Sequence, residues 1–157
     1  MTAPGSVRAY LSIGSNLGDR LGHLQGAVTG LGAVPGITVV AVSPVFETDP
    51  VGPDQPDYLN AAVAVETTLT PRALLAAAQA QEAAAARVRV ERWGPRTLDV
   101  DIVTFGDQVV DEPDLQIPHP RWAERDFVLA PLAALGHPAV VPRDWIGVRP
   151  TGLTLTS

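Results

Sequence analysis

The chain has 157 residues, a length typical of one domain that buries about two-thirds of the surface of its unfolded chain. Hydrophobic residues make up 46% of the sequence, which argues for a folded globule rather than a disordered chain. Cysteine is absent, which excludes disulfides and thiolate metal sites. The net charge of −6 argues against broad nucleic-acid binding, and the absence of lysine excludes a phosphate loop that depends on one. With no apolar run of membrane-spanning length and no N-terminal targeting pattern, we expect a soluble cytoplasmic protein. We also expect it to be a monomer.

The first half of the chain predicts a strand, a helix and two further strands. Val7 to Ile13 is mostly apolar and predicts a strand, and Asp19 is a candidate cap for a helix that ends at Gly32 or Gly36. The β-branched run from Ile37 to Phe46 predicts a second strand. A third strand is expected from Tyr58 to Glu66, where apolar residues alternate.

Two connections in this half are candidates for ligand contacts. The Gly14–Asn16 turn could cradle a phosphate, although most turns between a strand and a helix are only turns. Residues 48–57 include three prolines, so they form a stiff loop. The strand after it places Tyr58 and Asn60 on one face, where a ring that stacks and an amide that hydrogen-bonds suit a flat heterocycle. The alternative is that Tyr58 packs at a sheet edge and Asn60 is solvated.

The second half predicts a long helix, a strand and smaller elements. Thr70 and Pro71 are a cap and a first helical residue for an alanine-rich helix that reaches about Ala86. The remaining elements are a strand at 98–105, short strands at 109–110 and 115–117, an apolar helix at 127–135 and a weakly structured tail at 136–157. The order strand, helix, two strands, helix, strand predicts an α+β fold with a ferredoxin-like β-α-β-β-α-β core and a mostly antiparallel sheet. We expect one domain over 1–157, with its core at about 7–135.

The stretch from Arg92 to Asp101 carries the strongest chemical signal. Leu98, Val100 and Ile102 alternate with Asp99 and Asp101, so the two carboxylates share one face of a strand, roughly 6–7 Å apart at the Cα. Two such carboxylates can hold a hard cation such as Mg²⁺. Four arginines stand just upstream, at positions 87, 89, 92 and 96. Carboxylates beside arginines are typical of phosphoryl-transfer sites, whereas the alternative is a solvated strand face after a basic loop.

Four segments of the chain carry a resemblance to a known family. They are Gly14–Leu17, Gln55–Val63, Arg92–Ile102 and Pro118–His119. With these segments, the chain resembles the 6-hydroxymethyl-7,8-dihydropterin pyrophosphokinases, from the first strand to about Leu135. The resemblance implies an elaborated ferredoxin-like α+β domain. It also implies an enzyme of folate biosynthesis that transfers pyrophosphate from ATP to the pterin hydroxymethyl group and releases AMP.

The resemblance also implies a role for each matching residue. Asp99 and Asp101 would bind two Mg²⁺ ions and, with Arg87 and Arg96, form the catalytic group. The implied pterin-binding residues are Thr48, Pro50, Val51, Tyr58, Asn60, Trp93 and Phe127. The implied ATP-binding residues are Gln79, Glu82, Arg89, Arg92, His119 and Arg125. The expected partners are therefore two small molecules, ATP and the pterin alcohol.

The sequence departs from the family's pattern at several positions. Asp49 stands where proline is common, and Asp114, Gln116 and Pro120 differ near the expected adenine contacts. The loops before Tyr58 and before Trp93 each look one residue short. These departures concern the adenine contacts and the loops rather than the metal site.

Three other functions are compatible with parts of the sequence. A pterin- or nucleotide-binding module without turnover would be favoured by damage to the aspartates or arginines, which are intact. A structural protein with a charged hairpin gives no reason for Tyr58 and Asn60 to accompany the Asp-x-Asp pair. Another metal-dependent transferase, such as a sugar-nucleotide enzyme, is disfavoured by the Trp-Gly-Pro-Arg context of that pair.

Overall fold

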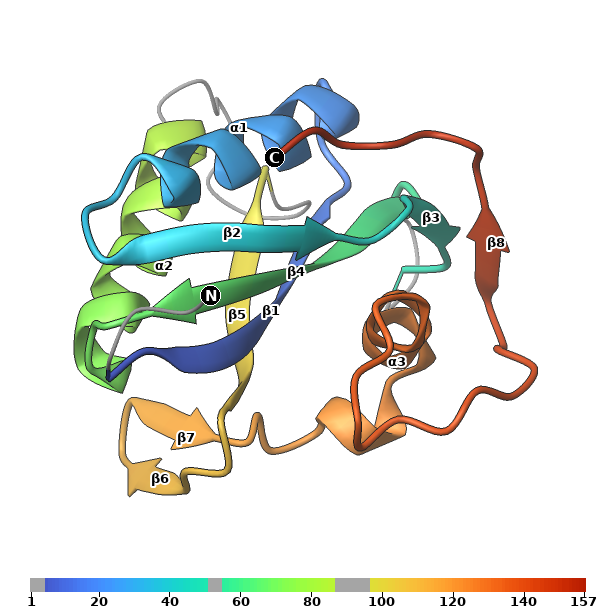
Figure 1. Ribbon diagram of the computed structural model, residues 1–157. Helices are drawn as coiled ribbons and strands as arrows, with labels where there is room; N and C mark the ends of the chain where they lie inside the picture. The colour runs from blue at the N-terminus through green and yellow to red at the C-terminus, as the bar shows by residue number, and fades with distance from the viewer. Residues whose placement is uncertain (1–4, 51–54, 87–96) are drawn as a thin grey trace.

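The computed structural model describes residues 5–50, 55–86 and 97–157 of the chain. Its main elements follow the predicted order (Figure 1): β1 (Val7–Ser15), α1 (Arg20–Gly32), β2 (Ile37–Val42), β3 (Phe46–Thr48), β4 (Tyr58–Thr67), α2 (Pro71–Ala86) and β5 (Asp99–Phe105). A hairpin of β6 (Val110–Glu112) and β7 (Leu115–Ile117), a short 3-10 helix η1 (Trp122–Glu124), α3 (Asp126–Ala134) and β8 (Val148–Pro150) complete it. The α+β class and the ferredoxin-like order are thus confirmed. No helix in these described ranges is long and apolar enough to cross a membrane.

One six-stranded antiparallel sheet organises the molecule. The strand order is β5-β1-β4-β3-β8, and β2 also pairs with β4, next to β3 along the same edge. β1 is central, because Ile13 pairs with Ala61 of β4 on one side and with Val100 of β5 on the other. Residues from β1, β4 and β5 therefore come together across the middle of the sheet.

Side chains alternate between the two faces of the sheet, and different helices pack against each face. On one face, Leu11 and Val63 belong to a core that α1 and α2 close with residues such as Leu24 and Leu74. On the other face, the smaller cluster around Tyr10 is completed by α3 and includes Ala62, Ala64, Val103, Val128 and Leu132. Because α3 covers only part of this second face, the polar residues of β1, β4 and β5 on the same side have room for a site.

Two boundaries in the first half differ from the prediction. β1 continues through Gly14 to Ser15, so the expected turn begins later and Gly14 belongs to the sheet. The predicted strand 37–46 is interrupted after Val42, because Pro44 has no N–H to donate to a ladder. At this break the hydroxyl of Ser43 accepts a hydrogen bond of 2.8 Å from the Ala62 N–H and donates one to the Pro44 carbonyl.

The C-terminal segment has little regular structure, but it is attached to the sheet. β8, which the sequence did not predict, pairs antiparallel with β3 at the sheet edge (Figure 1). Farther along, the Val45 N–H donates a hydrogen bond of 3.1 Å to the Leu153 carbonyl, and Gln25 of α1 bonds the backbone of Thr156. The tail therefore runs back across the domain and contacts both β3 and α1.

Candidate functional site

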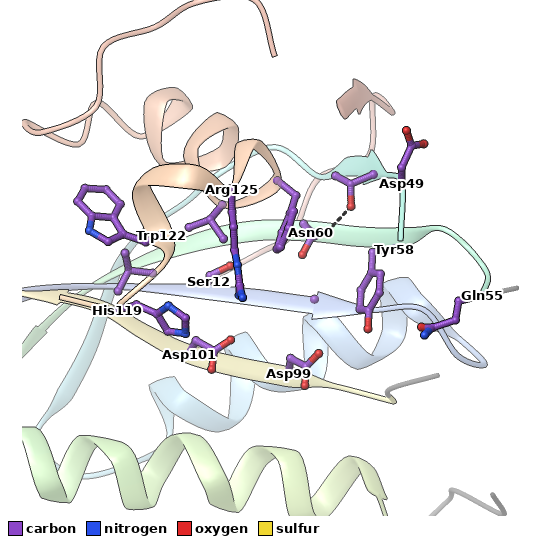
Figure 2. A pocket seen from close by; sticks show the side chains of 15 residues that line it. Ser12, Asp49, Gln55, Tyr58, Asn60, Asp99, Asp101, His119, Trp122 and Arg125 are labelled. Atoms are coloured by element: carbon purple, nitrogen blue, oxygen red, sulfur yellow. Dashed lines mark hydrogen bonds between the residues drawn. The ribbon is translucent and has the colours of Figure 1, made fainter. Parts of the chain in front are cut away.

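A cavity of about 300 Å³ opens on the sheet face that α3 covers only in part. We call it the sheet pocket. Its walls come from β1, β4 and β5, the β3 end, the loop before η1, and α3 (Figure 2). The lining residues are Ser12, Gly14, Thr48, Asp49, Gln55, Tyr58, Asn60, Asp99, Asp101, Val103, His119, Trp122, Arg125, Phe127 and Val128.

Strand register places the two aspartates at the floor of the sheet pocket. On β1, Ser12 pairs with Asp101, and Gly14 pairs with Asp99. Figure 2 shows both carboxylates side by side on β5, pointing to the pocket side of the sheet. Asp99 is half-buried and Asp101 is exposed, whereas Val100 between them is buried on the opposite face. The predicted alternation of this stretch is confirmed.

Across β1 from the aspartates, β4 supplies an aromatic ring and an amide. Tyr58 is half-buried, and Asn60 is buried opposite Gly14. The Asn60 Nδ2 donates a hydrogen bond of 2.6 Å to the Thr48 Oγ1, which fixes the orientation of the amide. A Cβ added at Gly14 would lie only 2.5 Å from the Asn60 Oδ1. Glycine at this position therefore leaves the space that the Asn60 amide occupies above β1.

A basic and an aromatic group approach from the α3 side. Arg125 extends from the start of α3 toward the aspartates (Figure 2), and its guanidinium carbon lies 5.8 Å from the centre of the Phe127 ring. His119 follows a cis peptide bond at Ile117–Pro118. The backbone N–H of His119 donates a hydrogen bond of 2.9 Å to the Val103 carbonyl. Burial, with the charge of Arg125, lowers the pKa of His119, although Asp101 opposes this shift. His119 is therefore a neutral donor and acceptor at physiological pH.

A second cavity of about 330 Å³ adjoins the first at Asp101 and His119, which line both. We call it the hairpin pocket, because the β6–β7 hairpin forms one side. Its lining residues are Leu75, Val100, Asp101, Ile102, Pro113, Asp114, Leu115, Gln116, His119 and Pro120. Its lining combines apolar side chains such as Leu75 and Leu115 with the polar Asp114 and Gln116. The Asp101 carboxylate therefore lies between two cavities with different linings.

Surface ion pairs hold the hairpin against α2. Arg72 makes a bidentate contact with Asp114 at 2.7 and 2.8 Å, and it also pairs with Glu112. Hydrogen bonding to Arg72 lowers the pKa of Asp114, and the same bonds raise the pKa of Arg72. Asp114 therefore stays charged at the rim of the hairpin pocket.

The expected ATP-binding residues Gln79 and Glu82 lie on α2. Neither is among the described residues that line the two pockets. Glu82 instead accepts a hydrogen bond of 2.9 Å from the Val100 N–H, between the two aspartates. This contact ties the edge of β5 to α2 and so positions the carboxylate pair.

Other expected site residues are not placed in a pocket. Pro50 is half-buried beside the sheet pocket and does not line it. Six further candidates lie outside the described residues: Val51, Arg87, Arg89, Arg92, Trp93 and Arg96. Their roles remain predictions from the sequence.

The donor set of the site fits Mg²⁺ bound together with a phosphate substrate. In the described parts of the chain, no group of three or more His, Asp or Glu side chains converges on one point as in a closed metal site. Mg²⁺ commonly takes only one or two carboxylates from a protein and completes its shell with phosphate oxygens and water. Asp99 and Asp101 provide such a pair on an open pocket floor.

Several lining residues were not identified from the sequence. Ser12 could have been found, because it alternates with Ile13 on a strand that pairs with the Asp-x-Asp strand. Gly14, Asp49 and Gln55 belong to the turn and the stiff loop that the sequence marked as candidates for ligand contacts, but no role was given to them individually. Trp122 gave no signal, because it lies outside regular strands and its placement depends on tertiary contacts.

Behind Trp122 lies a buried histidine, His137. Its Nδ1 accepts a hydrogen bond of 3.0 Å from the Ala139 N–H, so its Nε2 carries the proton and donates to the Thr104 Oγ1 at 2.9 Å. The centre of its ring lies 4.3 Å from the centre of the Tyr10 ring and 5.5 Å from the centre of the Trp122 ring. Burial lowers the pKa of His137, so a neutral ring supports this wall of the sheet pocket.

Comparison with known proteins decides which family uses this arrangement. The sequence profile of 7,8-dihydro-6-hydroxymethylpterin-pyrophosphokinase (HPPK) matches residues 10–137. The chain belongs to the HPPK family. The matched HPPK region contains both pockets, from Ser12 to Val128, and ends at His137.

Curated HPPK relatives are similar over most of their length. The chain is 50% identical over 137 residues to the 2-amino-4-hydroxy-6-hydroxymethyldihydropteridine pyrophosphokinase of Methylorubrum extorquens, covering 86% of each chain. It is 47% identical to the enzyme of the same name from Pseudomonas aeruginosa, over 82% of this chain and 80% of the relative. For the Bacillus subtilis enzyme of that name the identity is 48%, over 81% of this chain and 77% of the relative.

Proposed function

We infer that the chain is a pyrophosphokinase of folate biosynthesis, which transfers a pyrophosphoryl group from ATP to 6-hydroxymethyl-7,8-dihydropterin and releases AMP. The observation that carries the site assignment is the meeting of two cavities at Asp101 and His119. A transfer between two substrates needs both of them bound with the reacting atoms in contact. Two pockets that share a wall provide this within a single chain, so a monomer is sufficient.

The reaction joins the pterin hydroxyl oxygen to the β-phosphorus of ATP. The bond between that phosphorus and the oxygen bridging to the α-phosphorus breaks, and AMP leaves with the bridging oxygen. The hydroxyl proton is released to solvent. Because negative charge shifts between phosphoryl groups during this step, the residues of the site must neutralise charge and exclude water.

The sheet pocket is proposed to bind the pterin. Tyr58 and Phe127 supply aromatic faces for a flat ring, and the buried Asn60 amide supplies a donor and an acceptor for its edge. Because the Asn60–Thr48 hydrogen bond already fixes the amide, little side-chain entropy is lost when the pterin binds. The hydroxymethyl group would then point toward the aspartates.

The hairpin pocket is proposed to bind the adenine of ATP, with the phosphates lying over the aspartates. Leu75, Ile102 and Leu115 give apolar contacts for the base. His119, neutral and shared by both pockets, can donate to a phosphate oxygen, while the Arg125 guanidinium can pair with phosphate charge. Gln79, Glu82, Arg89 and Arg92 stay proposed nucleotide residues on the strength of the sequence.

Asp99 and Asp101 are the residues that would hold Mg²⁺. Two bound ions would supply charge neutralisation at the phosphates and a lower pKa for the attacking hydroxyl. The chain's own contribution is to fix both carboxylates on β5, which pairs with the central strand β1, while Glu82 bonds the backbone between them. We propose that Arg87 and Arg96 add positive charge to the transferring group and that Trp93, Pro50 and Val51 complete the pterin contacts.

A product assay tests this function. The protein is incubated with ATP, Mg²⁺ and 6-hydroxymethyl-7,8-dihydropterin, and AMP is resolved from ADP. We expect AMP in an amount equal to the pterin pyrophosphate formed, and no AMP when the pterin is left out. Formation of ADP would contradict pyrophosphoryl transfer, and pterin binding without any turnover would leave only a binding module.

A further inference from the structure

Arg149 of β8 joins two chain segments that lie far from it in sequence. Its Nη1 lies 2.8 Å from the Asp49 Oδ1, and its Nη2 lies 3.0 Å from the Asp57 Oδ2. Asp49 directly follows β3, and Asp57 directly precedes β4. One guanidinium therefore connects the end of one pocket strand to the beginning of the next.

Backbone contacts fix Arg149 in this place. β8 pairs with β3 so that Arg149 lies opposite Glu47 and Val148 lies opposite Thr48. One residue farther on, the Asp49 N–H donates a hydrogen bond of 3.0 Å to the Gly147 carbonyl. The short strand thus sets the position of Arg149 relative to the chain that leaves β3.

The surrounding charges make Arg149 hard to replace. Glu47, Asp49 and Asp57 place three carboxylates around its guanidinium, and hydrogen bonding to Asp49 is the main cause of its raised pKa. Arg20 of α1 is a second cation beside these carboxylates, with its Nη1 2.8 Å from the Glu47 Oε2 and 3.0 Å from the Asp57 carbonyl oxygen. Without Arg149, the Asp49 carboxylate would lose its ion pair and repel its acidic neighbours.

Both segments that Arg149 joins belong to the wall of the sheet pocket. Asp49 lines the pocket and is adjacent to Thr48, the acceptor of the Asn60 hydrogen bond. Asp57 is adjacent to Tyr58, the aromatic wall (Figure 2). A shift of either segment would therefore move a side chain that is proposed to contact the pterin.

We propose that Arg149 is a positioning residue for pterin binding, which holds the Thr48 and Tyr58 walls of the sheet pocket at a fixed separation without touching the pterin. The inference rests on the proposed function, in which this pocket takes the pterin. Exposed ion pairs contribute little to folding stability, and all three side chains are about 44–63% exposed. The effect of Arg149 is therefore on the fraction of molecules whose pocket is ready to bind.

The test is the pterin Kd of Arg149→Gln, measured by calorimetry with a non-hydrolysable ATP analogue and Mg²⁺ present. We expect the Kd to rise roughly three- to tenfold, while the Kd of the ATP analogue alone stays unchanged. Arg149→Lys should be intermediate, because an ammonium cannot bridge two carboxylates as a guanidinium does. Arg8→Gln is the control, since it removes a 2.7 Å ion pair between an exposed arginine and the largely buried Glu66, and both residues lie outside the pocket lining.

A double-mutant cycle with Asp57→Asn separates positioning from a general loss of stability. If Arg149 acts through Asp57, the effects of the two changes on the pterin Kd will be less than additive. An unchanged pterin Kd in Arg149→Gln would overturn the inference, and so would an equal loss of pterin and nucleotide affinity together with a lowered Tm. Failure of the wild-type protein to bind pterin would instead overturn the proposed function.

Discussion

The two pockets share Asp101 and His119 but are built in different ways. The floor of the sheet pocket comes from three adjacent strands of one sheet, and a buried hydrogen bond fixes its main polar group, Asn60. The hairpin pocket depends on a two-stranded ribbon whose Leu115 and Ile117 are buried in the core, and exposed ion pairs of Arg72 join this ribbon to α2. We conclude that buried contacts fix the floor of the sheet pocket, whereas the outer side of the hairpin pocket, like the edge of the sheet pocket that Arg149 holds, depends in part on ion pairs that salt and solvent weaken.

The largest expected effect is at the residues where the pockets meet. Asp101→Ala should lower kcat/KM by about a thousandfold or more, because the substrate phosphates lose a ligand for their bound cation. Since Asp101 is exposed, the free energy of unfolding should change by less than about 0.5 kcal/mol. Steady-state kinetics and urea unfolding measure both values. Asp107→Ala, in the exposed turn after β5, is the control, and normal turnover by Asp101→Ala would show that Asp101 is not a required ligand.

A smaller effect, confined to one pocket, is expected at Asn60. Asn60→Ala removes a buried amide from the sheet pocket and leaves the Thr48 hydroxyl without this donor. We expect the pterin Kd to rise about ten- to hundredfold, with the Kd of an ATP analogue unchanged. Thr48→Ser keeps the hydroxyl and should bind pterin nearly as the wild type does. Equal losses for both ligands would mean that the two pockets are not separate.

The corresponding change in the hairpin pocket should be milder and sensitive to salt. Arg72→Gln removes the ion pairs between α2 and the hairpin and leaves Asp114 without its bidentate partner. We expect the KM for ATP to rise about two- to fivefold at low ionic strength, with the pterin KM unchanged. In 0.5 M salt the variant and the wild type should converge, because screening already weakens the pairs of the wild type. A difference that salt does not alter would argue against this role of the ion pairs.

The smallest effect on substrate binding is expected at the support behind the sheet pocket, where the change is in folding stability instead. The pKa of His137 is lowered by burial, so in the unfolded chain this ring takes up a proton at higher pH than in the folded protein. Its contribution to stability is therefore fully present above the unfolded pKa of about 6.5 and is lost as the pH falls below it. His119 has a pKa lowered in the same direction and contributes in the same range of pH.

Urea unfolding at pH 7.5 and pH 5.5 measures this dependence. His137→Gln should be less stable than the wild type by about 1–3 kcal/mol at pH 7.5, because a buried hydrogen bond to Thr104 is lost. The loss of stability between the two pH values should also be smaller in the variant. An undiminished pH dependence would mean that His137 does not titrate as its surroundings imply.

Much of the fold could be predicted because local signals agreed with tertiary structure. Asp19 caps α1 through a 3.1 Å hydrogen bond from the Gly22 N–H, and Thr70 bonds the Ala73 N–H at the start of α2. The alternation in 98–102 predicted correctly that Asp99 and Asp101 share one face. In each case the cause lies within a few residues of the element, where sequence patterns are informative.

The parts that could not be predicted depend on contacts between distant segments. β8 has only three residues, and it forms because β3 offers an unpaired edge about one hundred positions earlier in the chain. The hairpin pocket likewise requires Leu75 of α2 and Leu115 of β7 to meet around β5. The break at Pro44 was readable in principle, because proline cannot donate to a sheet ladder.

The central claim is that the pterin and the nucleotide occupy adjoining pockets that meet at Asp101. The most direct measurement is the Kd of a single ligand in which a pterin and an adenosine are joined through a polyphosphate linker, with Mg²⁺ present. If the pockets adjoin, the linked ligand should bind about a hundredfold or more tighter than the better of its two halves, because the second contact becomes intramolecular. A linked ligand that binds no tighter than its better half would contradict the claim.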